Sequence, residues 1–289
     1  MKKKEILLVV NPISGNIDKD DIIPEIEAAV IKSGATLKIY KTTGIDDLNL
    51  IKGLLLNYHP ERVIAAGGDG TIKLATEAIR DHNIPLGIIP AGSANGLALN
   101  LKLPTTLQAQ LEVALGNNAQ SLDVLDINGE VCLHLADLGI NAELIQNYEA
   151  SSVRGKFGYL LQSIPTLIKS KYPFDFEIET ENRSLRKQGI LLAFANFNKY
   201  GTGANINPKG KPDDGIFEIV VFKNFDIIEI LKTLRNEEDL DPDFAEIIPA
   251  KKARIYCKNP VAFQVDGEYL GELQEINVKI IPQKLRVFQ

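Results

Sequence analysis

Several short segments of this 289-residue chain combine glycine with small polar or acidic side chains, which is the composition of phosphate-binding loops. The central segment, residues 65–71, reads Ala-Ala-Gly-Gly-Asp-Gly-Thr. Its three glycines allow positive φ and let a ligand touch the main chain, and turned amides before a helix N-terminus attract phosphate. A carboxylate among such amides repels phosphate unless it holds a cation or receives a proton. Asp69 is therefore a candidate for one of these roles.

The residues around this segment predict a strand before it and a helix after it. Val63–Ala66 is a short apolar run bounded by Pro60, and apolar residues at 72, 75, 78 and 79 recur at helical spacing. An ordinary strand-to-helix turn would show the same pattern, so this stretch alone leaves both interpretations open.

The first third of the chain alternates strands and helices. The pattern predicts strands at 6–10, 36–40, 63–66 and 85–90 and helices at 22–33, 47–57 and 72–79. Such alternation indicates a parallel sheet with helices on both faces. The loops after the first, third and fourth strands are rich in Gly, Asn or Ser, and these loops share the carboxyl edge of the sheet, where ligands bind.

From about residue 122 the pattern changes to successive short strands. They are predicted at 121–127, 131–138, 174–180, 189–196, 216–222, 252–257, 261–265 and 276–281, with one helix near 157–170. Asn-Gly or Asp-Gly turns begin at 128, 214 and 266. We therefore predict an α/β domain with a parallel sheet over 1–125 and an antiparallel β-sandwich domain over 126–289, whose last strand can return to the first domain.

Composition narrows the class of protein. The net charge of −6 argues against nucleic acid as a partner, and Cys132 and Cys257 are too few for a disulfide framework or a zinc site and are expected to be buried thiols. No apolar run is long enough for a transmembrane segment, and the run after Lys2–Lys4 is too short for a signal peptide. The sequence predicts a cytoplasmic protein. The three histidines (His59, His82 and His134) have no evident partner and are expected to be structural or on the surface.

Five segments resemble the signature motifs of the diacylglycerol kinase catalytic-domain family, which includes bacterial lipid kinases and sphingosine kinases and has NAD kinases and phosphofructokinases as distant relatives. The segments are Asn11–Gly15 (NPxSG), Gly67–Thr71 (GGDGT), Pro90–Asn95 (PxGTxN, with serine for threonine), Pro208 with Asp213–Gly215 (PxAxxxDDG) and Val265–Glu268 (VDGE). GGDGT alone is moderately specific, whereas five motifs in order over nearly the whole chain are highly specific.

The resemblance implies an ATP-dependent lipid kinase with an NAD kinase/phosphofructokinase-like first domain. The residues that it implies for the nucleotide are Asn11, Thr42, Gly67, Gly68, Asp69, Gly70, Thr71, Ser93 and Asn95. It further implies Mg²⁺ with the nucleotide and a structural Mg²⁺ at Asp214 and the main-chain carbonyls of Lys211 and Ile216. For each polar residue, bonding within its own loop is the alternative.

The same resemblance places a catalytic carboxylate at Glu268, where it would take the proton from the acceptor hydroxyl, with Asp69 polarising that hydroxyl or anchoring Mg²⁺. Asp266 instead begins the predicted turn, and its carboxylate is expected to bond its own backbone two residues on. The substrate would be a lipid at the membrane surface, touched reversibly. Lys2–Lys4 and residues 154–161 are candidates for that contact, and a core-packing helix is the alternative for 154–161.

The sequence also departs from the family pattern. Gly96 and Leu99 stand where many bacterial members have Asp and Arg, and Lys73-Leu74 replaces Asn-Glu. These changes leave two other functions open: a kinase of a soluble acceptor, as in NAD kinases, and a nucleotide-binding regulator without catalysis. A homodimer is compatible with the sequence and is not specified by it.

Overall fold

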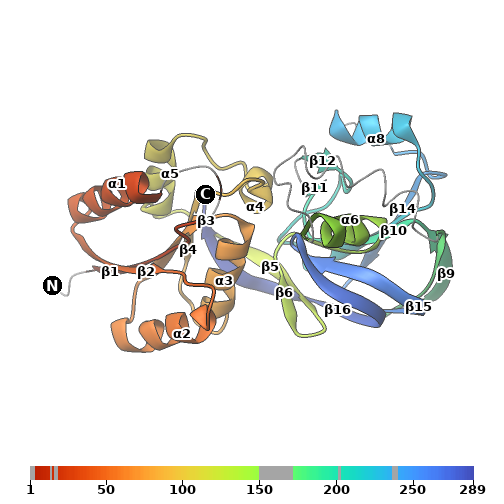
Figure 1. Cartoon of the computed structure of the whole chain (residues 1–289), viewed down its shortest axis with the longest axis horizontal. Coiled ribbons are helices and arrows are strands. Elements are labelled where there is room, and N and C mark those ends of the chain that lie inside the picture. The colour runs from red at the N-terminus through yellow and green to blue at the C-terminus, as the bar shows by residue number, and fades with distance from the viewer. Residues whose placement is uncertain (1–3, 14, 16–18, 150–171, 201–202, 236–239) are drawn as a thin grey trace. The chain divides into compact units, whose positions relative to one another are not determined.

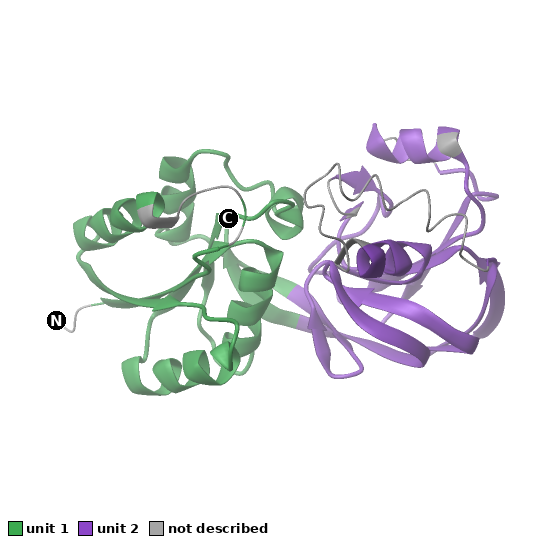
Figure 2. Ribbon diagram, viewed as in Figure 1, with its two compact units in different colours: residues 1–122, 283–289 green, residues 123–282 purple. Residues whose placement is uncertain are grey.

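The computed structural model describes residues 4–13, 15, 19–149, 172–200, 203–235 and 240–289. They divide into two compact units, and each is described by itself (Figure 2). Unit 1 comprises residues 1–122 and 283–289, and unit 2 comprises residues 123–282. The predicted helix at 157–170 and the candidate membrane contacts at Lys2–Lys3 and 154–161 lie outside the described residues.

Unit 1 is built on a parallel sheet with the strand order β4-β3-β1-β2 (Figure 1). Its strands are β1 (Lys4–Val10), β2 (Ala35–Lys41), β3 (Arg62–Gly67) and β4 (Leu86–Pro90). Its helices are α1 (Lys19–Lys32), α2 (Asp47–Tyr58), α3 (Asp69–Ile79), α4 (Gly96–Asn100) and α5 (Leu107–Ala114). The end of β16 (Glu268–Phe288) lies beside β4, where Val287 pairs with Leu86.

The sheet of unit 1 is buried on both faces. Leu7, Leu8, Val9 and Val10 on β1 are each fully buried, because alternate side chains face opposite helix layers. The core on one face joins β1 and β3 to α1 and α5, while α2 and α3 pack together on the other face (Figure 1). The predicted α/β half of the fold is confirmed.

Unit 2 is an antiparallel β domain, as predicted. Its main strand order is β14-β13-β10-β7-β15-β16; β5 pairs with β16 and β6 with β5, while β8 pairs with β15 and β9 with β8. The strands are β5 (Ala119–Ile127), β6 (Glu130–Cys132), β7 (Leu135–Gly139), β8 (Phe174–Thr180), β9 (Ser184–Gly189), β10 (Leu191–Ala195), β11 (Lys199–Tyr200), β12 (Ala204–Asn205), β13 (Phe217–Phe222), β14 (Ala245–Ala250) and β15 (Lys252–Val265). Helices α6 (Ile140–Glu149) and α8 (Ile227–Leu234) accompany them.

Several details of unit 2 differ from the prediction. The expected strand at 131–138 is two strands, β6 and β7, because the chain turns at residues 133–134. The two strands expected within 252–265 form one long strand, β15, with an irregular register after Tyr256. Sequence reasoning missed β9, β11, β12, β14, α6 and α8. β14 contains Pro249 and is the edge strand of its sheet, where a missing N–H is tolerated.

Two hairpin turns follow the prediction closely. Asp266 and Gly267 have φ values of 51° and 91°, and Asn128 and Gly129 have φ values of 53° and 93°. Positive φ at both central residues gives the backbone twist that a two-residue hairpin needs. Glu268 is therefore the first residue of the returning strand, where it pairs with Val265.

Candidate active site

The loops that follow the four strands of unit 1 are tied together by their main chains. The Thr42 amide donates to the Val10 carbonyl at 2.9 Å, the Asn11 amide to the Ala66 carbonyl at 3.2 Å, and the Ala91 amide to the Gly67 carbonyl at 2.8 Å. Each bond continues the sheet pairing just past the end of a strand. The structure thus brings the predicted nucleotide residues of unit 1 to one edge of its sheet.

The glycines of these loops are required by close packing. A Cβ added to Gly92 would lie 2.3 Å from the Gly68 Cα, and one added to Gly15 would lie 2.4 Å from the Ala91 carbonyl oxygen. A Cβ on Gly67 would lie 2.3 Å from the Thr71 hydroxyl oxygen. The expectation of positive φ in the Gly67–Gly70 turn is wrong, because none of its glycines has positive φ. Gly68 is needed because its main chain passes close to that of Gly92 on the neighbouring loop, and Gly67 because the Thr71 side chain occupies the space of a Cβ.

Helix α3 begins directly after the glycine turn. Gly68 is its N-cap residue, and within the described part of the chain no side chain caps this helix start. The first N–H groups and the helix dipole therefore attract an anion there. Thr71 lies one turn in and is buried, whereas Ser93 on the neighbouring loop is exposed.

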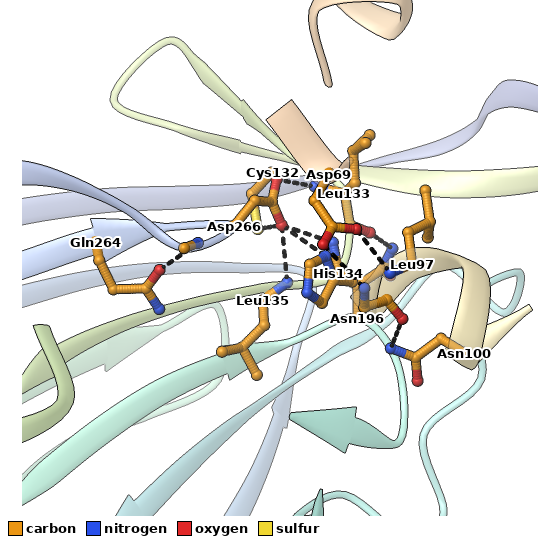
Figure 3. Close-up of polar contacts among 12 residues, drawn as sticks. Asp69, Leu97, Asn100, Cys132, Leu133, His134, Leu135, Asn196, Gln264 and Asp266 are labelled. Carbon is orange, nitrogen blue, oxygen red and sulfur yellow. Dashed lines mark hydrogen bonds and ion pairs between the residues drawn. The ribbon is translucent and has the colours of Figure 1, made fainter. Parts of the chain in front are cut away.

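Asp69 connects the glycine turn to the loop after β4 (Figure 3). Its carboxylate oxygens accept hydrogen bonds from the amides of Gly96 at 2.9 Å and Leu97 at 3.1 Å, which are the first N–H groups of α4. Asn95, with φ of 53°, bonds Gly92 through both side-chain atoms, at 2.8 and 3.0 Å. Asp69 and Asn95 thus fix the shape of this loop, in addition to any role toward a ligand.

Two other predicted residues sit in self-bonded loops. The Asn11 Oδ1 accepts a bond from the Ile13 amide at 3.1 Å, which is the local bonding that we considered as the alternative. The loop carrying Thr42 is held by Asp47, which accepts from the Tyr40 hydroxyl at 2.6 Å and the Gly44 amide at 2.7 Å. Burial, with Asp47 adding to it, raises the pKa of Tyr40 to about 12. Burial also raises the pKa of Asp47, but these hydrogen bonds outweigh it and lower that pKa overall.

In unit 2, Glu268 is exposed at the start of β16. It follows a turn that is held in place by hydrogen bonds to the buried side chain of Asp266. The Asp266 side chain is 2% exposed and accepts bonds from the amides of Leu133, His134 and Leu135, at 2.8, 3.1 and 3.2 Å (Figure 3). Three consecutive amides that converge on one carboxylate form an anion nest. The expectation that Asp266 bonds its own backbone two residues on is wrong, since its partners lie more than 130 positions earlier.

His134 completes the surroundings of Asp266. Its Nδ1 lies 3.0 Å from the Asp266 Oδ1, and the histidine is itself buried. Burial alone would raise the pKa of Asp266, but the charge of His134 and the amide bonds hold it below its ordinary value of 3.8. The expectation that His134 lacks a partner is wrong, although its structural character is as predicted. Cys132, also buried with a free thiol as predicted, lies 3.7 Å from the same carboxylate.

Sequence reasoning missed a second group of residues behind this turn. The Gln264 Oε1 accepts a bond from the Gly267 amide at 2.7 Å, and its Nε2 donates to Asp137, which also accepts from Asn141 at 2.8 Å. All three side chains are buried. Gln264 lies just before the recognised Val265–Glu268 motif, which is the only signal that pointed to it.

The predicted Mg²⁺ ligands lie on one loop of unit 2. The Asp214 Oδ1 accepts a bond from the Ile216 amide at 3.1 Å, and the Gly215 amide donates to Asp123 at 2.7 Å. Asp214 is exposed. A carboxylate and the two carbonyls of Lys211 and Ile216 are the oxygen donors that Mg²⁺ takes, so the residues fit the ion chemically. Within the described part of the chain, this loop included, no three His, Cys, Asp or Glu side chains are grouped for a metal.

Glu218 lies near this loop and is partly buried. Burial, together with the charge of Asp214, raises the pKa of Glu218. The 2.6 Å hydrogen bond from Asn207 acts in the opposite direction but does not outweigh them.

Among the helices of the described residues, none is long and apolar enough to cross a membrane.

Two family descriptions match successive parts of the chain. The diacylglycerol kinase catalytic domain matches residues 5–127, and the YegS C-terminal NAD kinase beta sandwich-like domain matches residues 136–289. A "Diacylglycerol kinase" of Staphylococcus saprophyticus is 26% identical over 296 residues, which cover 99% of this chain and 95% of the relative. A "Probable lipid kinase YegS" of Salmonella newport is 28% identical over 235 residues, covering 78% of this chain and 77% of the relative.

Solved structures share the fold. The crystal structure of a diacylglycerol kinase from Bacillus anthracis has a TM-score of 0.76 at 19% identity and covers all of this chain and 97% of its own. A second crystal structure from the same organism has a TM-score of 0.81 at 22% identity, with the same coverage. Because the two matched domains follow each other along nearly the whole sequence, this chain belongs to the bacterial diacylglycerol kinase and lipid kinase family.

Proposed function

We propose that this chain is an ATP-dependent lipid kinase, which transfers the γ-phosphate of ATP to the hydroxyl of a diacylglycerol, a sphingoid base or a related lipid. The observation that carries the proposal is the edge of the unit 1 sheet. There, four loops are tied by main-chain bonds and packed through glycines beside the uncapped start of α3. The family to which the chain belongs uses ATP, and this edge is suited to a polyphosphate.

Different loops of unit 1 would contact different parts of the nucleotide. Amides of Gly67–Thr71 would hold phosphate oxygens at the start of α3, and Ser93, Asn95, Asn11 and Thr42 would line the same edge. Mg²⁺ would neutralise phosphate charge when it accompanies the nucleotide. A second, structural Mg²⁺ would be held in unit 2 by Asp214 with the carbonyls of Lys211 and Ile216.

Glu268 would act as the general base. It would take the proton of the lipid hydroxyl while the hydroxyl oxygen bonds to the γ-phosphorus and the bond from that phosphorus to the β-phosphate oxygen breaks. Asp69 would polarise the hydroxyl or anchor Mg²⁺ while its bonds to Gly96 and Leu97 keep the neighbouring loop in place. Most of the rate enhancement would come from this positioning.

The test is transfer of radiolabelled phosphate from ATP into a total lipid extract, followed by identification of the labelled product. We expect label in the lipid phase, dependent on Mg²⁺. Label transferred to NAD and to no lipid would favour a kinase of a soluble acceptor instead.

A nucleotide-binding regulator without catalysis is the second candidate. It is favoured by the absence of the family's acidic residues at 96 and 74 and by the two amide bonds that occupy Asp69. ATP binding measured by calorimetry, with no transfer to any lipid or to NAD, would establish this candidate and exclude the kinase.

A further inference from the structure

Helix α8 turns two polar side chains inward, beside Ile230, which packs against the core of unit 2, and three apolar side chains outward. Glu229 and Thr233 are only 6% and 4% exposed, whereas Ile228, Leu231 and Leu234 are 69%, 46% and 54% exposed. These three apolar residues are spaced by three positions and lie on one side of the helix. Phe225, which precedes the helix, is 52% exposed. We call Phe225, Ile228, Leu231 and Leu234 the α8 face.

The orientation of this helix is fixed by a hydrogen bond from the Asp241 amide to Glu229 and by the packing of Ile230, while other bonds hold its own turns. Asp226 caps the first turn by accepting from the amides of Ile228 and Glu229. Inside, Glu229 bonds Lys232 at 2.6 Å and the Asp241 amide at 3.1 Å. The helix packs on β12 (Figure 1). A helix held by buried polar bonds does not rotate to hide its apolar side, so the α8 face stays open to a partner.

Other exposed apolar side chains within the described residues do not form such a stripe. On unit 1, Ile31 belongs to α1, and the position midway between Leu50 and Leu56 on α2 is Gly53, which interrupts any stripe there. Scattered side chains of this kind are ordinary for a protein surface. An aligned apolar stripe on a helix whose polar residues point inward is instead typical of an interaction site.

The size of the α8 face favours a lipid surface over a second copy of the chain. Four partly exposed side chains offer roughly a few hundred Å², whereas a stable protein interface needs about 800 Å² from each partner. A lipid surface needs only a few apolar side chains inserted among its headgroups. We propose that the α8 face docks on the lipid surface that carries the substrate, an inference that rests on the proposed lipid kinase function.

Charges near the helix indicate how the docking works. Asp226 stands at the start of α8 and Arg235 at its end, and residues 237–239, which follow shortly after, read Glu-Glu-Asp, so acidic residues outnumber basic ones around the helix ends. Acidic flanks do not attract anionic headgroups, so insertion of the apolar side chains drives the binding. Docking should therefore occur on uncharged phosphatidylcholine vesicles and change little with salt.

Tryptophan fluorescence tests this directly, because the chain contains no tryptophan. In a Leu231→Trp variant, we expect phosphatidylcholine vesicles containing diacylglycerol to shift the emission to shorter wavelength and brominated lipid to quench it. Leu56→Trp, at an exposed position on α2, is the matched control and should not respond. Absence of both responses at Leu231, with the protein and vesicles mixed at high concentration, would overturn the proposal.

A second experiment separates docking from catalysis. In a variant with Ile228→Gln, Leu231→Gln and Leu234→Gln, the helix former Gln replaces each exposed apolar residue. We expect vesicle binding, and phosphorylation of diacylglycerol in vesicles at limiting lipid, to fall roughly tenfold or more. Activity on a short-chain, water-soluble diacylglycerol should stay unchanged. The control variant carries Ile31→Gln, Leu50→Gln and Leu56→Gln and should bind vesicles like the wild type.

The outcomes distinguish the two proposals. Equal vesicle binding by the triple α8 variant and the wild type would overturn the docking proposal, even if the enzyme phosphorylates lipids. If the wild type transfers phosphate to no lipid of a total extract, the kinase proposal fails, and the Leu231→Trp response still decides whether the α8 face meets a lipid surface. Dimerisation through this face, detected by sedimentation and abolished in the triple variant, would replace the lipid surface as its occupant.

Discussion

Two carboxylates of the β15–β16 hairpin, only two positions apart, have opposite surroundings. Asp266 is buried among three amides and His134, while Glu268 is exposed at the start of the next strand. A fully bonded, buried carboxylate is suited to holding the turn, and an exposed one can meet a substrate. Removing the charge of Glu268 should therefore affect catalysis, whereas removing the charge of Asp266 should affect stability.

We predict that Glu268→Gln lowers kcat about 10²–10⁴-fold with ATP affinity nearly unchanged, because general-base assistance is lost. Asp266→Asn should instead lower the free energy of unfolding by about 3–5 kcal/mol, since it leaves a buried network unbalanced. The measurements are turnover at saturating ATP, Mg²⁺ and lipid, and urea unfolding. Glu272→Gln, at an exposed position on the same strand, is the control and should behave like the wild type. A fully active Glu268→Gln enzyme beside an inactive, stable Asp266→Asn enzyme would reverse the two roles.

The close approach of Gly68 to Gly92 predicts that a larger residue at position 68 disturbs the glycine turn. Gly68 has φ of −88°, which alanine adopts easily, but its Cβ would lie 3.2 Å from the Gly92 Cα. We expect Gly68→Ala to separate the two loops slightly and to weaken ATP binding by about 1–3 kcal/mol. Isothermal titration calorimetry with ATP measures this.

The matched control for that variant is Gly53→Ala within α2, where an added Cβ meets nothing within 4 Å. It should leave ATP affinity unchanged and stabilise the helix slightly. Unchanged affinity in a folded Gly68→Ala protein would mean that the turn has only a structural role.

At the scale of elements, the sequence pattern correctly predicted the strands and turns whose conformation depends on neighbouring residues alone. The parallel strands of unit 1 are apolar runs buried on both faces, and the Asp266-Gly267 hairpin follows from two residues that accept positive φ. Helix α8 was missed because its inward side chains, Glu229 and Thr233, break the usual periodicity. Its orientation depends on bonds to residues such as Asp241, which no local pattern contains.

For the candidate site, too, the sequence predicted the local features but not the contacts between distant residues. Motifs located the loops, but the partners of Asp69 and Asp266 lie 27 and more than 130 positions away. Spacing along a sequence does not report such pairings, because the fold creates them. The closeness of Gly68 and Gly92 is likewise a property of two loops together.

The attachment of the β15–β16 hairpin to residues 133–135 should depend on pH. The pKa of folded Asp266 lies below 3.8, its ordinary value, which applies to the unfolded chain. Its contribution to stability is therefore fully present above pH 3.8 and is lost as the pH falls through the lower, folded pKa. We predict that the free energy of unfolding drops in this acidic range.

Urea unfolding between pH 6 and pH 2.5 measures this effect. His134→Gln removes the charge that lowers the pKa of Asp266, so the loss of stability should begin at a higher pH in that variant. Identical pH profiles for the two proteins would show that the pair does not contribute.

At the scale of the whole molecule, β16 belongs to both units. Its last residues complete unit 1, where Val287 and Phe288 are buried and the Arg62 guanidinium lies 4.4 Å from the centre of the Phe288 ring. We predict that Phe288→Ala destabilises unit 1 by about 3–5 kcal/mol. Differential scanning calorimetry with and without ATP should show this change, whereas Leu270→Ala, partly exposed on the same strand, should have a much smaller effect. Equal melting profiles for the two variants would contradict the prediction.

Because residues 283–289 belong to unit 1, the order of synthesis matters for this chain. A ribosome makes residues 1–122 first, then all of residues 123–282, and only then the strand that pairs with β4. N-terminal domains generally fold first during synthesis, but here the first unit lacks an edge of its sheet until translation reaches residue 287. Ribosome-bound chains stopped at residue 122 should be digested by protease much faster than the same residues in the finished protein; equal resistance would contradict this. The unit that is begun first is therefore finished last.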